Sequence, residues 1–152
     1  MAPPVGFMVA LLMKMLPLCS FGLVVLLSAT FELPAQPATP LTVGKGVYDQ
    51  HCATCHGLTG DGNGPAAVWL YPKPRDFSGG LFKIKSTPGQ LLPTDADLFQ
   101  SVTRGLPGSS MPSFSYLTEL ERRDVVEYVK QLTAYTDKSG QLVNRFAQAA
   151  AA

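Results

Sequence analysis

Two cysteines and a histidine in the stretch Cys52-Ala53-Thr54-Cys55-His56 are the residues whose types and spacing point most directly to chemistry. Thiols three positions apart can each add across one vinyl group of a single porphyrin, and C-x-x-C-H is the spacing of covalent haem attachment. The histidine that follows is then held under the iron, where an imidazole nitrogen can bind it. We therefore predict one haem c, covalently attached through Cys52 and Cys55, with His56 as an axial ligand.

Other uses of these cysteines explain fewer of the residues. A disulfide between Cys52 and Cys55 leaves His56 without a role. A zinc site needs about four ligands, and the only further candidates are Cys19, in an apolar segment, and His51. A thioredoxin-like redox pair requires a βαβ pattern around it, whereas a Gly- and Pro-rich loop and a helix flank this motif.

Length and charge set bounds on the rest of the chain. The 152 residues leave room for one small domain. Twelve basic and 11 acidic residues give a net charge of +1, which argues against a polyanion-binding protein, so we expect no nucleic-acid partner.

The N-terminal 31 residues have the composition of an export signal or a membrane anchor. Lys14 precedes an uncharged apolar run from Met15 to Phe31. No A-x-A cleavage site follows, and the stretch from Val5 to Phe31 is long enough to span a bilayer if Lys14 snorkels. Both alternatives stay open, and both place the rest of the chain outside the cytoplasm, because positive charge stays inside. We expect a periplasmic or otherwise extracytoplasmic protein, either soluble after cleavage or anchored to the membrane through this segment.

Composition divides the remaining chain into three parts. Residues 32–40 form a Pro/Ala-rich linker, whose prolines favour an extended, semi-rigid spacer. Residues 41–136 form the folded domain. Residues 137–152 contain few apolar side chains before a run of alanines, so we expect a flexible tail, with a short terminal helix as the alternative.

Three helices are predicted within the domain. The first, at about 42–52, carries the cysteine motif at its end. The second spans about 95–104 and the third about 118–133, where apolar residues recur at helical spacing. Gly44 lies inside the first helix, where glycine costs about 1 kcal/mol relative to alanine. Such a glycine predicts the close approach of another helix.

The starts of the second and third helices have local signals. Thr94 is a good N-cap for the second helix, with Asp97 at its third position. Thr118 and Glu121 fit the capping-box pattern at the start of the third. No alternating strand pattern of useful length appears. The predicted fold class is therefore all-α, with three or more helices and Gly/Pro-rich loops around one covalently bound haem.

Taken together, these residues resemble a class I c-type cytochrome, a small monohaem domain. Besides C-x-x-C-H, the stretch Gly44-x-x-x-Tyr48-x-x-x-Cys52 is similar to the family's N-terminal helix, and Tyr128 lies where its C-terminal helix carries an aromatic residue. In that family the two terminal helices cross at the small glycine. The resemblance covers about residues 41–135 and implies the small cytochrome c fold.

The resemblance also implies a distal iron ligand. Methionines stand at positions 1, 8, 13, 15 and 111, and only Met111 lies in the predicted domain. The Met111-Pro112 pair, in the loop between the second and third helices, looks like the family's axial-methionine loop. A core or loop methionine is the alternative. The rival nitrogen, from His51, adjoins Cys52 on the proximal side, so the implied metal ligands are His56 and Met111.

Other cofactor-binding residues follow from the same resemblance. His56 should donate its second ring N–H to a carbonyl, and Pro65 matches the family's proline in this role. Arg75, Tyr71 and Trp69 are candidates for contact with the haem propionates, although the two aromatics could be ordinary core or loop residues. The predicted haem-packing side chains are Phe77, Leu98 and Phe114.

The implied function is one-electron transfer between larger redox proteins, a donor and an acceptor, by a carrier that is not itself an enzyme. One alternative is a cytochrome subunit permanently bound to a membrane oxidoreductase complex. Another is a haem enzyme or gas sensor with a labile distal ligand, and a haem-free redox or structural module is the last. Four cations in one loop could dock an acidic partner, with a solvated loop as the alternative: Lys73, Arg75, Lys83 and Lys85.

Overall fold

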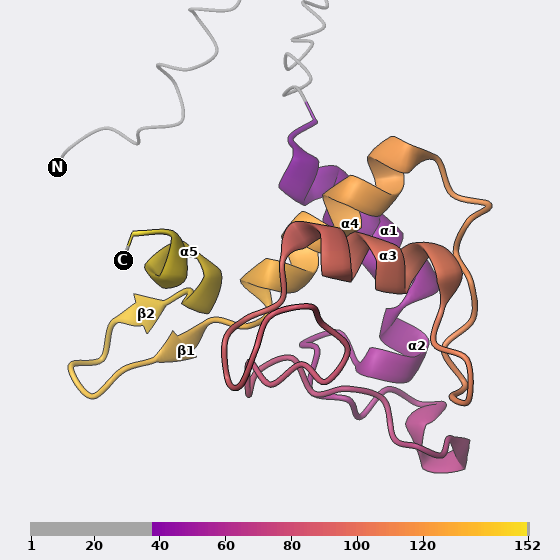
Figure 1. Ribbon diagram of the computed structural model, residues 1–152, viewed down its shortest axis with the longest axis horizontal. Coiled ribbons are helices and arrows are strands. Elements are labelled where there is room, and N and C mark those ends of the chain that lie inside the picture. Colours follow the sequence, from indigo (N-terminus) through magenta and orange to yellow (C-terminus); the bar gives the residue numbers. More distant parts are fainter. Residues whose placement is uncertain (1–37, 152) are drawn as a thin grey trace, which may run out of the picture. The chain divides into compact units, whose positions relative to one another are not determined.

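The computed structural model describes residues 38–151 (Figure 1). The predicted signal or anchor and most of the predicted linker lie outside these described residues. No helix within residues 38–151 combines the length and the apolar character needed to cross a membrane. The elements in chain order are α1 (Pro40–His51), α2 (Ala53–His56), the 3₁₀ turn η2 (Ala67–Trp69), α3 (Asp95–Arg104), α4 (Glu119–Gln131), β1 (Tyr135–Thr136), β2 (Leu142–Val143) and α5 (Arg145–Ala150).

Helices α1 and α4 cross at Gly44, as the sequence predicts. A Cβ atom built on Gly44 would lie only 2.0 Å from the carbonyl oxygen of Asp124 on α4, so the backbones meet where only glycine fits. Next to this crossing, the rings of Tyr48 and Tyr128 pack with their centroids 5.2 Å apart. The crossing fixes the direction in which α1 delivers the cysteine motif.

The predicted capping signals begin α3 and α4. Thr94 and Asp97 form a reciprocal capping box at the start of α3. Thr118 and Glu121 form another at the start of α4. Each box pairs two backbone N–H groups that have no partner inside the helix, which is why helix starts are encoded locally. Helix α3 packs beside α4, and both are visible in front of α1 in Figure 1.

The segment predicted as a flexible tail has regular structure. Strands β1 and β2 form a short antiparallel hairpin, with Tyr135 opposite Val143. Helix α5 follows, and Asn144 caps it by accepting hydrogen bonds from the N–H groups of Phe146 and Ala147. The predicted tail, residues 137–152, thus contains β2 and α5, while β1 lies just before it. In the described residues the fold is otherwise helical, which confirms the predicted class.

One cluster of buried side chains connects the helices to the loops. Its members are Val47, Tyr48, Ala53, Phe77, Phe114, Leu117, Val125 and Val129. Cys52, Phe82 and Met111 pack against it while remaining partly exposed. The cluster therefore brings the cysteine motif and the methionine loop, which lie 59 positions apart in the sequence, to one core.

Candidate functional site: the C-x-x-C-H segment and its surroundings

The cysteine motif lies in one helical turn that continues from α1. Cys52 ends α1 and its N–H donates to the Tyr48 carbonyl at 2.8 Å. The N–H groups of Cys55 and His56 both donate to the Cys52 carbonyl, at 3.1 and 2.9 Å. Because residues three and four positions apart share one side of a helix, this turn presents both thiols and the imidazole together.

Tyr48 anchors the end of this turn to α1. Its side chain is fully buried, and its hydroxyl donates to the Gly57 carbonyl at 2.7 Å. Burial raises the pKa of Tyr48, so the hydroxyl keeps its proton and remains a donor. This hydrogen bond fixes where the chain leaves the motif after His56.

His56 is held by one of its two ring nitrogens. Nδ1 lies 3.0 Å from the Arg75 carbonyl oxygen, and a carbonyl can only accept, so Nδ1 carries the proton. Burial lowers the pKa of His56, which favours the neutral ring, although the bond to Arg75 acts in the opposite direction. A neutral ring protonated on Nδ1 leaves the Nε2 lone pair available for a metal.

The carbonyl that faces His56 corrects the prediction for Pro65. Pro65 is exposed, and its neighbours bond to the motif backbone: the Gly64 N–H donates to the Cys55 carbonyl and the Ala66 N–H to the Thr54 carbonyl. These two hydrogen bonds hold residues 64–66 alongside the helical turn that contains the cysteine motif.

The chain returns to His56 only ten residues later. A Cβ atom on Gly62 would meet the Pro74 carbonyl oxygen at 2.8 Å, which shows how closely the returning segment packs. The carbonyl of Arg75 therefore takes the role that the family resemblance implied for Pro65.

The two cysteines are free thiols and both are partly buried. Burial, with a smaller contribution from the neighbouring Cys55, raises the pKa of Cys52 to about 12. The raised pKa favours the protonated thiol of Cys52 at neutral pH. No cluster of three or more His, Cys, Asp or Glu side chains suited to a metal ion occurs in the described part of the chain. Two thiols and one Nε2 lone pair fit a covalently held haem better than a bare metal site.

Phe77, Leu98 and Phe114 are all buried, with relative exposures of 7–8%. Phe77 lies against the imidazole of His56, with ring centroids 4.7 Å apart and planes inclined by 16°. Such stacked pairs contribute about 0.5–1.5 kcal/mol beyond their buried area. Phe77 therefore covers one face of the His56 ring, while packing of Leu98 and Phe114 on a haem remains a prediction.

Met111 lies in a loop that folds back on the end of α3. The Met111 carbonyl accepts from the Leu106 N–H at 3.1 Å, and the Phe114 N–H donates to the Val102 carbonyl at 3.1 Å. Gly105 adopts a φ of 70° and its missing Cβ leaves room for the backbone of Met111 and Pro112. The loop thus holds a partly buried thioether against the same core cluster as Cys52.

The two candidate aromatics for propionate contact lie on the surface. Trp69 and Tyr71 are 86% and 91% exposed, so neither belongs to the protein core. Their contact with a haem remains a prediction. The backbone of Arg75 has a defined role at His56, and its side chain is partly buried.

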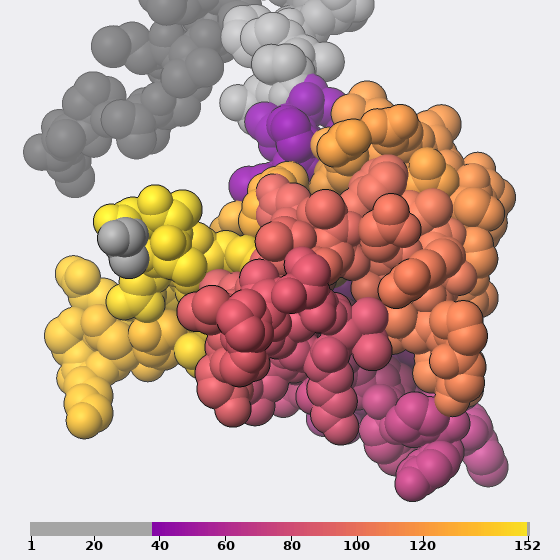
Figure 2. Space-filling view, in the orientation of Figure 1, coloured from indigo at the N-terminus to yellow at the C-terminus, as the bar shows by residue number. Residues whose placement is uncertain are grey.

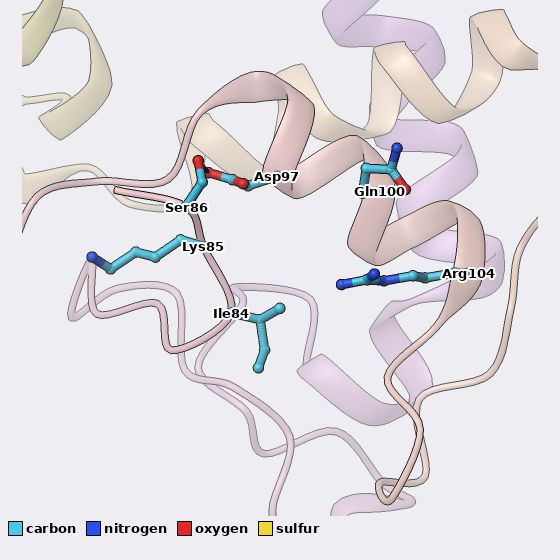
Figure 3. Close-up of a pocket in the computed structure, with 6 residues that line it drawn as sticks. All are labelled: Ile84, Lys85, Ser86, Asp97, Gln100 and Arg104. Atoms are coloured by element: carbon cyan, nitrogen blue, oxygen red, sulfur yellow. Dashed lines mark hydrogen bonds between the residues drawn. The ribbon is translucent and has the colours of Figure 1, made fainter. Parts of the chain in front are cut away.

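Arg104 is a candidate that the sequence did not single out. It lines a hollow of about 330 Å³ between α3 and the loop at residues 84–86, together with Ile84, Lys85, Ser86, Asp97 and Gln100 (Figure 3). Ser86 donates to Asp97 at 3.0 Å across the rim. Within residues 38–151 the Arg104 guanidinium has no hydrogen-bond or ion-pair partner, whereas Lys85 is bonded to the Thr87 and Gly89 carbonyls. Arg104 is thus a cation available to a carboxylate, a property that α3 periodicity alone could not reveal.

Two of the three lysines in the proposed docking loop are tied to backbone. Lys73 donates to the Ala67 carbonyl at 2.7 Å and Lys85 to the Thr87 carbonyl at 2.8 Å, while Lys83 is exposed. The ion pairs in the described residues instead involve α1, α3 and α4, such as Lys130 with Asp95. No carboxylate of residues 38–151 therefore neutralises the charge of the loop lysines.

Comparison with known proteins identifies the family. The family model described as "Cytochrome c" matches residues 41–133, more than half of the chain. The chain belongs to the cytochrome c family, which carries covalent haem c and acts in haem-based electron transfer. No curated protein matches it.

One solved structure gives a more specific similarity. A chain of the reducing HAO-like protein complex Kustc0457/Kustc0458 from Kuenenia stuttgartiensis is 40% identical, with a TM-score of 0.60. The match covers 63% of this chain and 44% of that chain, so the present chain spans less than half the length of its relative. The fold, the C-x-x-C-H segment and the family model agree on a cytochrome c domain.

Proposed function

We propose that this protein is a single-haem electron carrier with His56 and Met111 as axial ligands, working outside the cytoplasm between larger redox proteins. The observation that supports the proposal is the hydrogen bond that fixes which ring nitrogen of His56 carries the proton. Its Nδ1 is committed to the Arg75 carbonyl, so Nε2 is the free nitrogen, in the same helical turn as two free thiols. When bound, haem c supplies a one-electron ferric/ferrous couple.

Residues of the chain would orient the iron ligands and determine which oxidation state of the iron is favoured. The Arg75 carbonyl orients the imidazole and raises its basicity as a ligand. The Met111 thioether is a soft, neutral ligand that favours the ferrous state. With His56 and Met111 both holding the iron, no position would be left for a substrate, which is the property of a carrier rather than an enzyme. Arg104, which has no ion-pair partner among the described residues, would be available to a haem propionate.

Partner docking follows from the loop lysines. Lys73, Lys83 and Lys85 lack carboxylate partners among the described residues and would steer an acidic donor or acceptor toward the site. Export is proposed from the apolar N-terminal segment that follows Lys14. Changing Lys83 and Lys85 to Glu should slow reduction by an acidic partner most at low salt, because salt screens exposed charges.

A second candidate is a cytochrome subunit that stays bound to a larger oxidoreductase. It is favoured by one observation, the 40% identity to a chain that comes from a complex of a reducing HAO-like protein. Washed membranes and gentle co-purification separate the two candidates. A carrier is released and purifies alone, whereas a subunit is retained with the same larger chains in constant ratio.

Carbon monoxide tests the axial ligation. The holoprotein, expressed with a haem-attachment system and reduced with dithionite, should show no spectral change on adding carbon monoxide. Met111→Ala should bind it readily and should have a lower reduction potential, because a thioether that favours ferrous iron has been removed. Rapid carbonyl formation in the unmodified protein would instead favour a haem enzyme or gas sensor, and an unchanged Met111→Ala variant would exclude Met111 as the ligand.

A further inference from the structure

The hairpin and α5 lie beyond the part of the chain that matches the family, which ends at residue 133. They do not project freely. In Figure 2 the yellow C-terminal segment lies against the red loop, and Arg145, Gln148 and Ala149 share a hollow with Gly80 and Leu81. This C-terminal appendage, residues 134–151, therefore contacts the loop that returns from the proximal histidine.

An aromatic row connects the appendage to His56. The imidazole stacks on Phe77 at 4.7 Å, and Phe77 stacks on Phe82 at 6.0 Å, each pair with planes inclined by 16°. The ring of Phe146 on α5 then meets Phe82 edge-on, with centroids 6.2 Å apart and an interplanar angle of 74°. In all three pairs the centroid distance and the interplanar angle are those of favourable aromatic contacts. Four rings thus run from the axial histidine to the last helix.

The last ring of the row is fixed from two sides. Asn144 caps α5 and also donates to the Lys130 carbonyl at the end of α4, at 3.0 Å. The Lys130 ammonium lies 5.7 Å from the centre of the Phe146 ring. On the other side, Arg145 fills the space beside Gly80, where any Cβ would collide with it, and stacks over Tyr135. Phe146 is therefore anchored to α4 as well as to the loop.

We infer that Phe82 and Phe146 are positioning residues for the proximal ligand, and that the appendage acts through them on the iron site. This inference rests on the proposed haem ligation by His56. Phe77 covers one imidazole face, and Phe82 backed by Phe146 keeps Phe77 in place. Loss of this support lets Phe77 move and admits water beside His56. Water stabilises the oxidised site, which carries one more positive charge, so the reduction potential falls.

The experiment compares the holoprotein with Phe146→Ala, Phe82→Ala and the double variant. Leu142→Ala is the matched control, because Leu142 is a 77% exposed side chain in the same appendage and is outside the aromatic row. Reduction potentials and ferric EPR g-values are measured at a temperature where every variant is folded. We expect both to shift in Phe146→Ala and Phe82→Ala but not in Leu142→Ala. The double variant should shift no further than Phe82→Ala, because the two rings act in one row.

Several results would overturn the inference. Phe146→Ala could lose thermal stability with an unchanged potential and EPR spectrum, which would make the appendage merely structural. Additive shifts in the double variant would show that the two rings act independently. A shift of equal size in Leu142→Ala would show that the appendage does not act on the iron site through the aromatic row. If Phe82→Ala yields no holoprotein, Phe82→Leu replaces it. Failure of the proposed function is distinguishable, because the unmodified protein would then lack a low-spin His/Met spectrum altogether.

Discussion

Replacing Gly44 with alanine should destabilise the protein, although alanine is the better helix former. A Cβ at position 44 would lie 2.0 Å from the Asp124 carbonyl oxygen and 3.2 Å from the Tyr128 Cβ. Ordinary contacts begin near 3.5 Å, so α1 and α4 must separate by about 1.5 Å at their crossing. Since the two atoms nearest the new methyl group, the carbonyl oxygen and carbonyl carbon of Asp124, belong to the backbone of α4, no side-chain rotation can relieve the collision.

The magnitude follows from two opposing terms. Overpacking a tight contact costs about 1–3 kcal/mol, and the obstruction here is backbone, which places the cost at about 3 kcal/mol. The higher helix propensity of alanine relative to glycine offsets about 1 kcal/mol of this cost. The net loss for Gly44→Ala is therefore about 2 kcal/mol, which for a domain of this size lowers the melting temperature by about 8 °C.

Gly46 provides the control within the same helix. Nothing lies within 4 Å of a Cβ built there, so Gly46→Ala should gain about 1 kcal/mol from helix propensity alone. Thermal unfolding of both holoproteins, followed by far-UV circular dichroism, measures the difference. Because α1 delivers the cysteine motif, Gly44→Ala should also reduce the yield of haem-loaded protein. A Gly44→Ala protein as stable as Gly46→Ala would refute the argument from the crossing.

Three further predictions concern single side chains. Tyr48→Phe removes the donor to the Gly57 carbonyl and should cost about 1–3 kcal/mol of unfolding free energy, measured by denaturant titration; an unchanged midpoint would contradict this. His56→Ala should give no stable haem-loaded protein, which the pyridine haemochrome assay reports. At the α3 capping box, the N–H of Thr94 and further hydrogen bonds lower the pKa of Asp97 to about 2. Because the pKa falls on folding, this carboxylate stabilises the protein above about pH 4 and ceases to do so as the pH falls toward 2. The stability difference from Asp97→Asn, followed by denaturant midpoints against pH, should vanish across that window, and a constant difference would argue against the ionised cap.

Local sequence signals predicted the helices well. The capping boxes at Thr94 and Thr118 each depend on residues three positions apart, so they operate before any tertiary contact forms. A glycine inside the predicted first helix likewise indicated the close approach of another helix, and the contact of Gly44 with Asp124 confirms it.

Contacts between distant segments could not be predicted in the same way. The carbonyl that pairs with His56 belongs to Arg75, 19 residues away. The residues on either side of Pro65, Gly64 and Ala66, are instead hydrogen-bonded to the backbone of the cysteine motif. The resemblance to the family's proline had favoured Pro65 instead. The place of Arg104 beside the hollow, with no partner in residues 38–151, was likewise visible only once α3 and the 84–86 loop were placed side by side (Figure 3).

By itself the sequence determined the chemistry of the site, because C-x-x-C-H places two thiols and an imidazole in one helical turn without help from the rest of the fold. It also determined where α3 and α4 begin. Only the tertiary structure decided which nitrogen of His56 is free, and that the tail predicted to be flexible packs Phe146 against Phe82. The physical reason is range: caps and motifs depend on neighbours within one turn, whereas the partner of a ring nitrogen and the cover of a ring face depend on how distant segments pack.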